Sequence, residues 1–397
     1  MAVSFLSILG YGAQRAILPA HLKEMGAGVG HIGFLLSLYG VPRALMNVAG
    51  GYLADRFSRK WNLVAGVMLY LASYMALAVF SGSVSVSLSR ISMGIGLSWG
   101  TTAAMAVLSD NTSERSRGTV FGLQKAFFWA GITLSGYFAG RLGSRVGFSG
   151  VMLGSAYLGA LGVLLVALLL TESRHAEERR RPPTLSEASR LLEPRFLMLG
   201  FVGTVSKVLD DGVIVLLLPL FLVESGMGNA ALGALLVTCY TASFAVGQPV
   251  GGALSDSAGR LRIVWAGHWL SACGLALGLL SRSAAGLMCT AVLLGLGTGF
   301  VSPTAEALSG EAAPSGLSGT SLGLWRLFRD TGSFVGPAVL GAVSAASGIK
   351  TALVTAGAMV AVAQVFTRQL KRAGFEPSGC RTGQSPGEVG ASHGMSP

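Results

Sequence analysis

The chain has too few charged residues for an ordinary soluble domain. Asp, Glu, Lys and Arg make up only 12% of its 397 residues, whereas soluble domains carry about a quarter. Acidic residues are the scarcer class, at 18 against 29 basic residues. Hydrophobic residues account for 51% of the chain, and the mean hydropathy is +0.62. This composition is typical of a protein that lies within a lipid bilayer.

Cysteine and histidine are also scarce, and they are scattered along the chain. The four cysteines have neither the spacing of a zinc site nor that of a disulfide framework. The five histidines form no cluster with acidic residues and no pairing with a serine. A Gly-x-x-x-x-Gly-Lys-Ser/Thr sequence, which would indicate ATP binding, is absent from the sequence. We therefore expect no enzyme activity, no metal and no cofactor.

Long apolar runs separated by short polar segments dominate the sequence. Crossing the ~30 Å hydrocarbon core takes roughly 20 helical residues, and in lipid the backbone must bond within its own helix. Runs such as residues 163–170 do not alternate apolar and polar residues, unlike the strands of a membrane barrel. The sequence predicts an all-α integral membrane protein with twelve transmembrane helices. The expected spans are 3–22, 32–54, 61–81, 84–108, 118–142, 148–170, 196–223, 231–254, 263–280, 285–308, 317–345 and 351–366.

Two segments of different composition punctuate this pattern. Residues 172–195 are rich in charge, and residues 371–397 are rich in Gly, Ser and Pro without apolar periodicity, which is typical of disorder. We therefore predict four regions. They are a six-helix bundle at 1–171, a cytoplasmic linker at 172–195, a second six-helix bundle at 196–370 and a disordered cytoplasmic tail at 371–397.

Basic residues gather in alternate loops, including the loop with Arg56, Arg59 and Lys60. Because cytoplasmic loops are enriched in Lys and Arg, both termini are expected in the cytoplasm and the protein in the cell (plasma or inner) membrane. The same rule accounts for the net charge of +11 without a nucleic acid partner. The expected surroundings are the lipid bilayer, and we expect a monomer.

The two halves of the chain resemble one another at a constant spacing. Asp55 recurs as Asp256, and Asp110 recurs as the acid Glu311; acidic matches are informative because acidic residues are so few. Further matches are Gly50 and Gly51 with Gly251 and Gly252, Arg59 with Arg260, Tyr39 with Tyr240, Gly94 with Gly295, and Phe127 with Phe328. Two six-helix sets of equal orientation are therefore expected, related by an axis along the membrane normal. Such bundles can rock to open one side and then the other.

The loop after the second expected helix resembles the signature of the major facilitator superfamily. It reads Gly51-Tyr-Leu-Ala-Asp55-Arg56-Phe-Ser58-Arg59-Lys60, with Ser58 at a position where the family has glycine. The second-half copy reads Gly252-x-x-x-Asp256-x-x-Gly259-Arg260. Arg90-x-x-x-Gly94-x-Gly96 resembles the family's fourth-helix signature. The resemblance extends over nearly the whole chain, to about residue 366.

The resemblance implies two pseudo-symmetric six-helix bundles and a secondary active transporter that moves a small solute by alternating access. The pattern is most similar to the branch that exchanges drugs or metabolites for protons, so protons and a small-molecule substrate are the implied partners. Two alternatives remain open. One is an uptake carrier for organic anions or metabolites, and the other is a transport-dead membrane receptor or scaffold.

The charges of the two signature loops are candidate gating residues. We interpret those of the first half as a cytoplasmic cluster that holds the outward-open state and breaks when that side opens. The alternative is that basic residues only anchor the loops in the cytoplasm. The candidates are Gly51, Asp55, Arg56, Arg59, Asp110 and Arg117 in the first half, and Gly252, Asp256 and Arg260 in the second.

Charged residues inside the spans are costly and usually face a cavity or a partner. The spacings Lys207–Asp210 and Arg326–Asp330 place each pair on one helix face, as expected for structural pairs. The resemblance implies that helices one, four, seven and ten line the substrate cavity. It thereby nominates Tyr11, Gln14, Arg15, Arg90, Lys207, Asp210, Asp211 and Glu306 as substrate-binding residues.

Two hypotheses follow from these intramembrane charges. Asp210 or Asp211 is the candidate for a proton-coupling carboxylate, the alternative being a fixed ion pair with a basic neighbour. The excess of basic residues suggests an anionic substrate, with Arg15 and Arg90 as ligands, because guanidinium binds carboxylate and phosphate bidentately. An aromatic drug pocket is the competing possibility. Its candidates are Tyr11, Trp129, Trp325 and Phe328.

Overall fold

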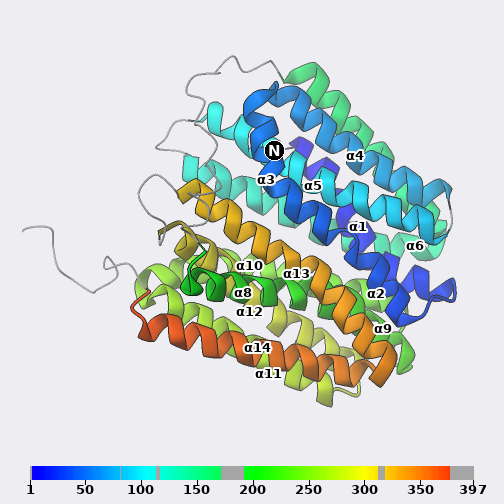
Figure 1. Ribbon diagram of the computed structural model, residues 1–397. Coiled ribbons are helices and arrows are strands. Elements are labelled where there is room, and N and C mark those ends of the chain that lie inside the picture. Colours follow the sequence, from blue (N-terminus) through cyan, green and yellow to red (C-terminus); the bar gives the residue numbers. More distant parts are fainter. Residues whose placement is uncertain (1, 81, 113–116, 171–191, 312–317, 376–397) are drawn as a thin grey trace, which may run out of the picture.

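The computed structural model describes residues 2–80, 82–112, 117–170, 192–311 and 318–375, and these residues form helices and short turns (Figure 1). Eight of the described helices are long and apolar enough to cross a membrane on length and composition alone. The helical segments follow the twelve expected spans, so the prediction of an all-α protein with twelve transmembrane crossings is confirmed. The expected linker and tail fall almost entirely outside the described residues.

The first half forms six crossings, and two of its details differ from the expectation. The second crossing is broken at Leu38 and Tyr39, and the fifth and sixth run together through Gly147, whose φ of 71° suits glycine. The break frees the carbonyl of Leu36, which accepts a hydrogen bond from Arg90. The helices are α1 (Ala2–Glu24), α2 (Val29–Ser37), α3 (Gly40–Arg56), α4 (Arg59–Val79), α5 (Ser83–Asp110) and α6 (Arg117–Leu169).

The second half also forms six crossings, and its first crossing is irregular. A π-helix interrupts it between two α-helical pieces, a feature that is often found at functional sites. The pieces are α8 (Pro194–Lys207), η1 (Val208–Leu217) and α9 (Leu218–Glu224). The remaining helices are α10 (Ala230–Ala258), α11 (Arg260–Leu280), α12 (Ala284–Glu311), α13 (Ser318–Ser347) and α14 (Ile349–Arg372).

The two halves lie side by side, with α1 to α6 in the upper part of Figure 1 and α8 to α14 in the lower part. We call the end of the bundle that holds Arg59 and Arg260 the signature-loop end. The opposite end, with the turns at Gly26 and Gly348, is the far end. The halves meet where α2 and α3 pack on α13, and where α1 and α6 pack on α10.

At the far end the two halves pack without room for a further methyl group. A Cβ atom on Gly33 of α2 would lie 2.4 Å from the carbonyl oxygen of Pro337 on α13. A Cβ atom on Gly140 of α6 would lie 2.7 Å from the Cβ of Ala234 on α10. Small residues thus allow the helices to approach closely, and this end of the bundle is closed.

Substitution of Gly33 by alanine should open the far end. The added methyl group cannot fit against Pro337, so α2 and α13 must separate, and the state with this end closed loses population. Electron-spin distances between labels at Met25→Cys and Lys350→Cys, with the native cysteines replaced by serine, should shift to longer values. Gly357→Ala on α14, where a Cβ meets nothing within 4 Å, is the matched control. An unchanged distance distribution in Gly33→Ala would contradict the prediction.

Candidate functional site

Two adjacent carboxylates on η1 meet two basic side chains in the interior of the bundle. Arg15 of α1 donates Nη2–H to Asp210 Oδ1, and its Nη1 lies 2.9 Å from Asp211 Oδ1. Lys207 Nζ lies 2.6 Å from Asp210 Oδ2 and 3.4 Å from Asp211 Oδ2. All four side chains are at most 13% exposed. We call these residues the buried tetrad; its two positive and two negative charges balance, as burial requires.

The predicted Lys207–Asp210 pair is therefore present, and the sequence spacing explains how both acids reach one lysine. Asp210 and Asp211 follow Lys207 by three and four positions, which places both on its side of the helix. The two carboxylates are held unequally, because Asp211 Oδ2 accepts no hydrogen bond among the described residues. The 3.4 Å ion pair with Lys207 is thus the contact of Asp211 Oδ2 among the described residues.

A chain of hydroxyl groups leads from the buried tetrad to a second charged group. Arg15 Nη1 donates to the Tyr11 hydroxyl at 3.1 Å, and Tyr11 lies 2.9 Å from the Tyr39 hydroxyl. Tyr39 in turn accepts a hydrogen bond from Arg43 of α3. Tyr11 and Tyr39 therefore connect Arg15 with Arg43 in the first half.

Asp330 of α13 is the centre of the second charged group and is completely buried. Its Oδ2 lies 3.0 Å from Arg43 Nε and 2.8 Å from Asn47 Nδ2, and its Oδ1 lies 2.8 Å from Arg329 Nε. We call these four residues the Asp330 cluster. The predicted pair of Arg326 with Asp330 is wrong. Arg326 faces α12 instead, where it pairs with Glu306 and not with Asp330 of its own helix.

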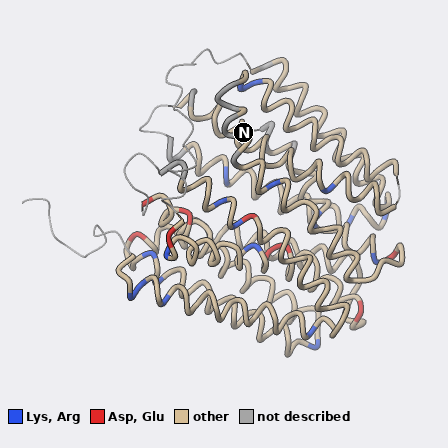
Figure 2. Tube along the Cα trace, viewed as in Figure 1, with Lys and Arg blue, Asp and Glu red and all other residues tan. Residues whose placement is uncertain are grey.

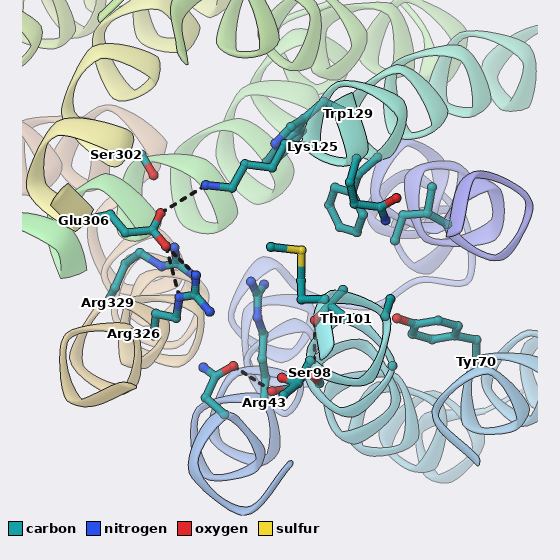
Figure 3. A pocket seen from close by; sticks show the side chains of 18 of the residues that line it. Arg43, Tyr70, Ser98, Thr101, Lys125, Trp129, Ser302, Glu306, Arg326 and Arg329 are labelled. Atoms are coloured by element: carbon teal, nitrogen blue, oxygen red, sulfur yellow. Dashed lines mark hydrogen bonds and ion pairs between the residues drawn. The ribbon is translucent and has the colours of Figure 1, made fainter. Parts of the chain in front are cut away.

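Glu306 of α12 lies between the halves (Figure 3). Arg326 directs Nε and Nη2 to Glu306 Oε1, at 3.1 and 2.5 Å. Lys125 of α6 approaches Glu306 Oε2 at 3.4 Å. We call these three residues the Glu306 cluster.

Arg90 and Gln14, two of the nominated substrate ligands, bond to the protein itself. Arg90 donates to Gln14 Oε1 at 3.0 Å and to the Leu36 carbonyl at 3.2 Å, and it lies over the Tyr39 ring. Gln14 donates to Ser89 at 3.2 Å. Among the described residues these partners are all uncharged. In this arrangement Arg90 holds the break between α2 and α3.

A cavity of about 270 Å³ lies between the halves, toward the signature-loop end. Glu306 lines it, and Figure 3 shows the charged groups of Lys125, Arg326 and Arg329 directed toward it from α6 and α13. A smaller cavity of about 70 Å³ shares Trp129, Phe244 and other lining residues with the first. The smaller cavity is also lined by three members of the buried tetrad and by Tyr11, namely Arg15, Lys207, Asp210 and Tyr11. The two cavities are therefore neighbours, and the smaller one reaches the buried tetrad.

The nominated aromatic residues divide between these spaces. Trp129 lines both cavities, and Tyr11 and Trp325 line the smaller one. Phe328 packs on Phe196 instead, with ring centroids 6.4 Å apart. The cavity wall is therefore both aromatic and cationic.

Four cavity residues were not nominated from the sequence, although all carry a signal that could have found them. Arg43, Lys125, Arg326 and Arg329 are charged residues within expected spans. They lie on the second, fifth and eleventh crossings, whereas the nomination relied on the first, fourth, seventh and tenth. Treating each intramembrane charge as a cavity candidate would have included them.

At the signature-loop end the structure shows the second-half copy of the proposed gating charges. Arg260 binds Glu311 of α12 through two hydrogen bonds, and it lies 3.5 Å from Asp256. These residues repeat Arg59, Asp110 and Asp55 of the first half. The first-half copy cannot be compared in the same way. Its candidates Gly51, Asp55, Arg56, Asp110 and Arg117 have side chains or positions outside the described part of the structure. Figure 2 shows charges at both ends and a few within the bundle.

Comparison with known proteins identifies the chain's class. The profile of the Major Facilitator Superfamily matches residues 1–234 and 200–379. The chain therefore belongs to this family of membrane transporters, and it is a multi-pass membrane protein. The resemblance noted in the sequence and the expectation of a transporter are confirmed.

Individual relatives agree with this membership. The chain is 25% identical to a class G tetracycline resistance protein from Vibrio anguillarum, over 84% of this chain and 86% of the relative. A class C tetracycline resistance protein from Escherichia coli is 31% identical over 45% of each chain.

Solved structures show the same fold. A bacterial homologue of the human lysosomal transporter Spinster, inward-facing and occupied, has a TM-score of 0.81 at 15% identity, covering 95% of this chain and 97% of the other. The human organic anion transporter MFSD10 has a TM-score of 0.69 at 17% identity, covering 92% of this chain and 97% of the other.

Proposed function

We propose that this transporter is a proton-coupled exporter of drugs or metabolites in the cell membrane. The observation that carries the proposal is the pair of neighbouring cavities between the halves, the smaller of which is lined by Asp210 of the buried tetrad. Tetracycline resistance proteins among the relatives support drugs as substrates. The positive-inside distribution supports a cytoplasmic position of the signature-loop end and of both termini. The described state is then inward-facing, with residues 1–171 and 196–370 as the two rocking bundles.

Ion pairs between the halves provide the elements that must break during rocking. In each such pair that the described residues form, the basic residue belongs to the first half and the acid to the second. The pairs are Arg15 with Asp210 and Asp211, Arg43 with Asp330, Lys125 with Glu306, and Lys23 with Glu224. A proton on Asp211 would remove one attraction to Arg15 and so lower the cost of separating the halves. Protonation and rocking would thereby be coupled.

Asp211→Asn should uncouple transport from protons. In proteoliposomes loaded with tetracycline or a quinolone, the wild type should move protons when substrate moves, and Asp211→Asn should move none. Exchange of labelled for unlabelled substrate, which needs no net proton transfer, should continue in the variant. The exposed Glu193→Gln is the control and should behave as the wild type. Proton flux that survives in Asp211→Asn would contradict this role.

A second candidate function, an organic-anion carrier, is favoured by one observation: among the described residues that line the larger cavity, cationic side chains outnumber acids. Flux of anions but not of drugs in the same assay would select it. The remaining alternative, a receptor or scaffold, would be indicated by correctly folded protein that moves neither class of solute nor protons.

A further inference from the structure

Among the described residues, the charges around the larger cavity do not balance, in contrast to those of the buried tetrad. The cationic lining residues are Arg43, Lys125, Arg326 and Arg329. Their acidic partners are Glu306 in the cavity wall and Asp330 behind it. Four cations against two acids leave a positive excess inside a membrane-embedded bundle, where unpaired charge is costly. An anion that enters from the open end would supply the missing negative charge.

We propose that this cavity binds an amphipathic organic anion, whose carboxylate or similar acidic group lies between Lys125 and Arg326. The proposal deepens the transport function proposed above and rests on it. Lys125 and Arg326 are the most exposed of the four cations, at 48% and 36% of their side chains. Arg43 and Arg329 both hold Asp330 and contribute positive potential from behind.

The internal repeat supports this placement, because Lys125 and Arg326 occupy equivalent positions in the two halves. The register that matches Phe127 with Phe328 also matches Lys125 with Arg326. The equivalent of Glu306 is Met105, which lines the same cavity. The two cations thus face the cavity from symmetric positions, and the acid between them is present on one side only.

Both cations have room for a further acceptor. Arg326 directs Nε and Nη2 to a single oxygen of Glu306, and its Nη1 lies outside that pair of hydrogen bonds. Lys125 contributes one contact of 3.4 Å to Glu306 from its three possible donors. An incoming carboxylate can therefore lie beside the Glu306 carboxylate and accept from the remaining donors of Arg326 and Lys125.

The other wall of the cavity suits an apolar or aromatic body. Its side chains come from α1, α4, α6 and α10 and are Ile8, Leu63, Val67, Phe128, Trp129 and Phe244. The volume of about 270 Å³ is just below the 300–1,000 Å³ of pockets for drug-sized ligands. The cavity therefore fits a small acid with one or two rings better than a large lipid.

The test uses the full-length protein and three probes of one shape. Naphthalene-2-carboxylate, its neutral amide and 2-naphthylmethylammonium differ mainly in charge, and their binding can be measured by calorimetry in lipid nanodiscs. We expect the carboxylate to bind at least tenfold more tightly than either of the others. Equal binding of all three, or no binding of the carboxylate, would overturn the proposal.

Variants should change the binding affinity in opposite directions for an anionic and a cationic ligand. Lys125→Gln and Arg326→Gln should each weaken binding of the carboxylate about tenfold, the factor that 1.4 kcal/mol represents, and leave the amide unchanged. Glu306→Gln should strengthen carboxylate binding, because a competing anion is removed. If the ligand is a cation instead, the ammonium probe binds best and Glu306→Gln abolishes its binding. Arg282→Gln, exposed at the far end, is the matched control.

Exchange of labelled naphthalene-2-carboxylate in proteoliposomes tests the anion site separately from the proposed transport function. Binding of the carboxylate without exchange of either this probe or tetracycline would leave the anion site intact and contradict the proposed transport function. Transport of tetracycline without binding of the carboxylate would support transport and overturn the anion site. Binding and exchange together would support both.

Discussion

Replacement of Arg15 by alanine is expected to abolish transport and to lower the stability of the folded protein by about 3–5 kcal/mol, the usual cost of removing one partner of a buried ion pair. Arg15 is 3% exposed and binds both Asp210 and Asp211. Without it, two buried carboxylates share Lys207 alone, and one negative charge is left without compensation. The transport defect follows because Arg15 is the first-half partner of the carboxylates.

A second substitution separates charge balance from function. Arg15→Ala combined with Asp210→Asn leaves one base, Lys207, and one acid, Asp211. Thermal unfolding, followed by tryptophan fluorescence in detergent, should show recovery of much of the lost stability. Transport should stay absent, since no ion pair then joins the halves at the buried tetrad.

The control is an exposed arginine. Arg141 is exposed near the far end and stacks on Tyr137, so Arg141→Ala should change stability little. If Arg15→Ala unfolded at the wild-type temperature, the four charges would not be the balanced, buried group that the structure shows.

Much of the fold follows from local patterns in the sequence. Apolar runs of the length of a bilayer dictate the crossings, because lipid offers the backbone no other hydrogen-bond partner. The Lys207–Asp210 pair was predicted from helical spacing, since three residues along a helix bring two side chains to one face. The π-helix at Val208–Leu217 preserves that proximity, although no pattern in the sequence announced it.

Contacts between distant segments could not be obtained in this way. Asp330 was assigned to Arg326 by helical spacing, but Arg43 and Asn47 reach it from the other half of the chain. Glu306 takes Arg326 instead. A spacing rule describes one helix, whereas an ion pair in a bundle is decided by which neighbouring helix presents the nearest opposite charge.

The repeat itself was informative for the framework and misleading for the site. Asp256, Arg260 and Glu311 form the charged group expected from their first-half copies. The intramembrane acids do not follow the repeat, and in the described ion pairs between the halves the acid always lies in the second half. The repeat therefore predicts the two helical bundles, and departures from the repeat mark the charged residues that connect them.

Asp330→Asn should strongly lower the stability of the folded protein, second only to Arg15→Ala. The carboxylate is completely buried and accepts from Arg43, Asn47 and Arg329. A neutral amide leaves two guanidinium groups close together without an acid, and we expect a loss of about 3 kcal/mol or more. Thermal unfolding measures it, with the exposed Glu193→Gln as the carboxylate control. A change no larger than that of the control would contradict the assignment of Asp330 as the shared partner.

The double variant Asp330→Asn with Arg43→Gln distinguishes packing from rocking. With one charge removed from each half, Arg329 is the remaining cation of the cluster, and much of the stability should return. The link between α3 and α13 is still lost, so nothing at this position opposes their separation. Spin labels at Met25→Cys and Lys350→Cys should therefore report longer far-end distances than in the wild type. Restored stability with wild-type distances would mean that the Asp330 cluster holds the fold together without biasing which end of the transporter is open.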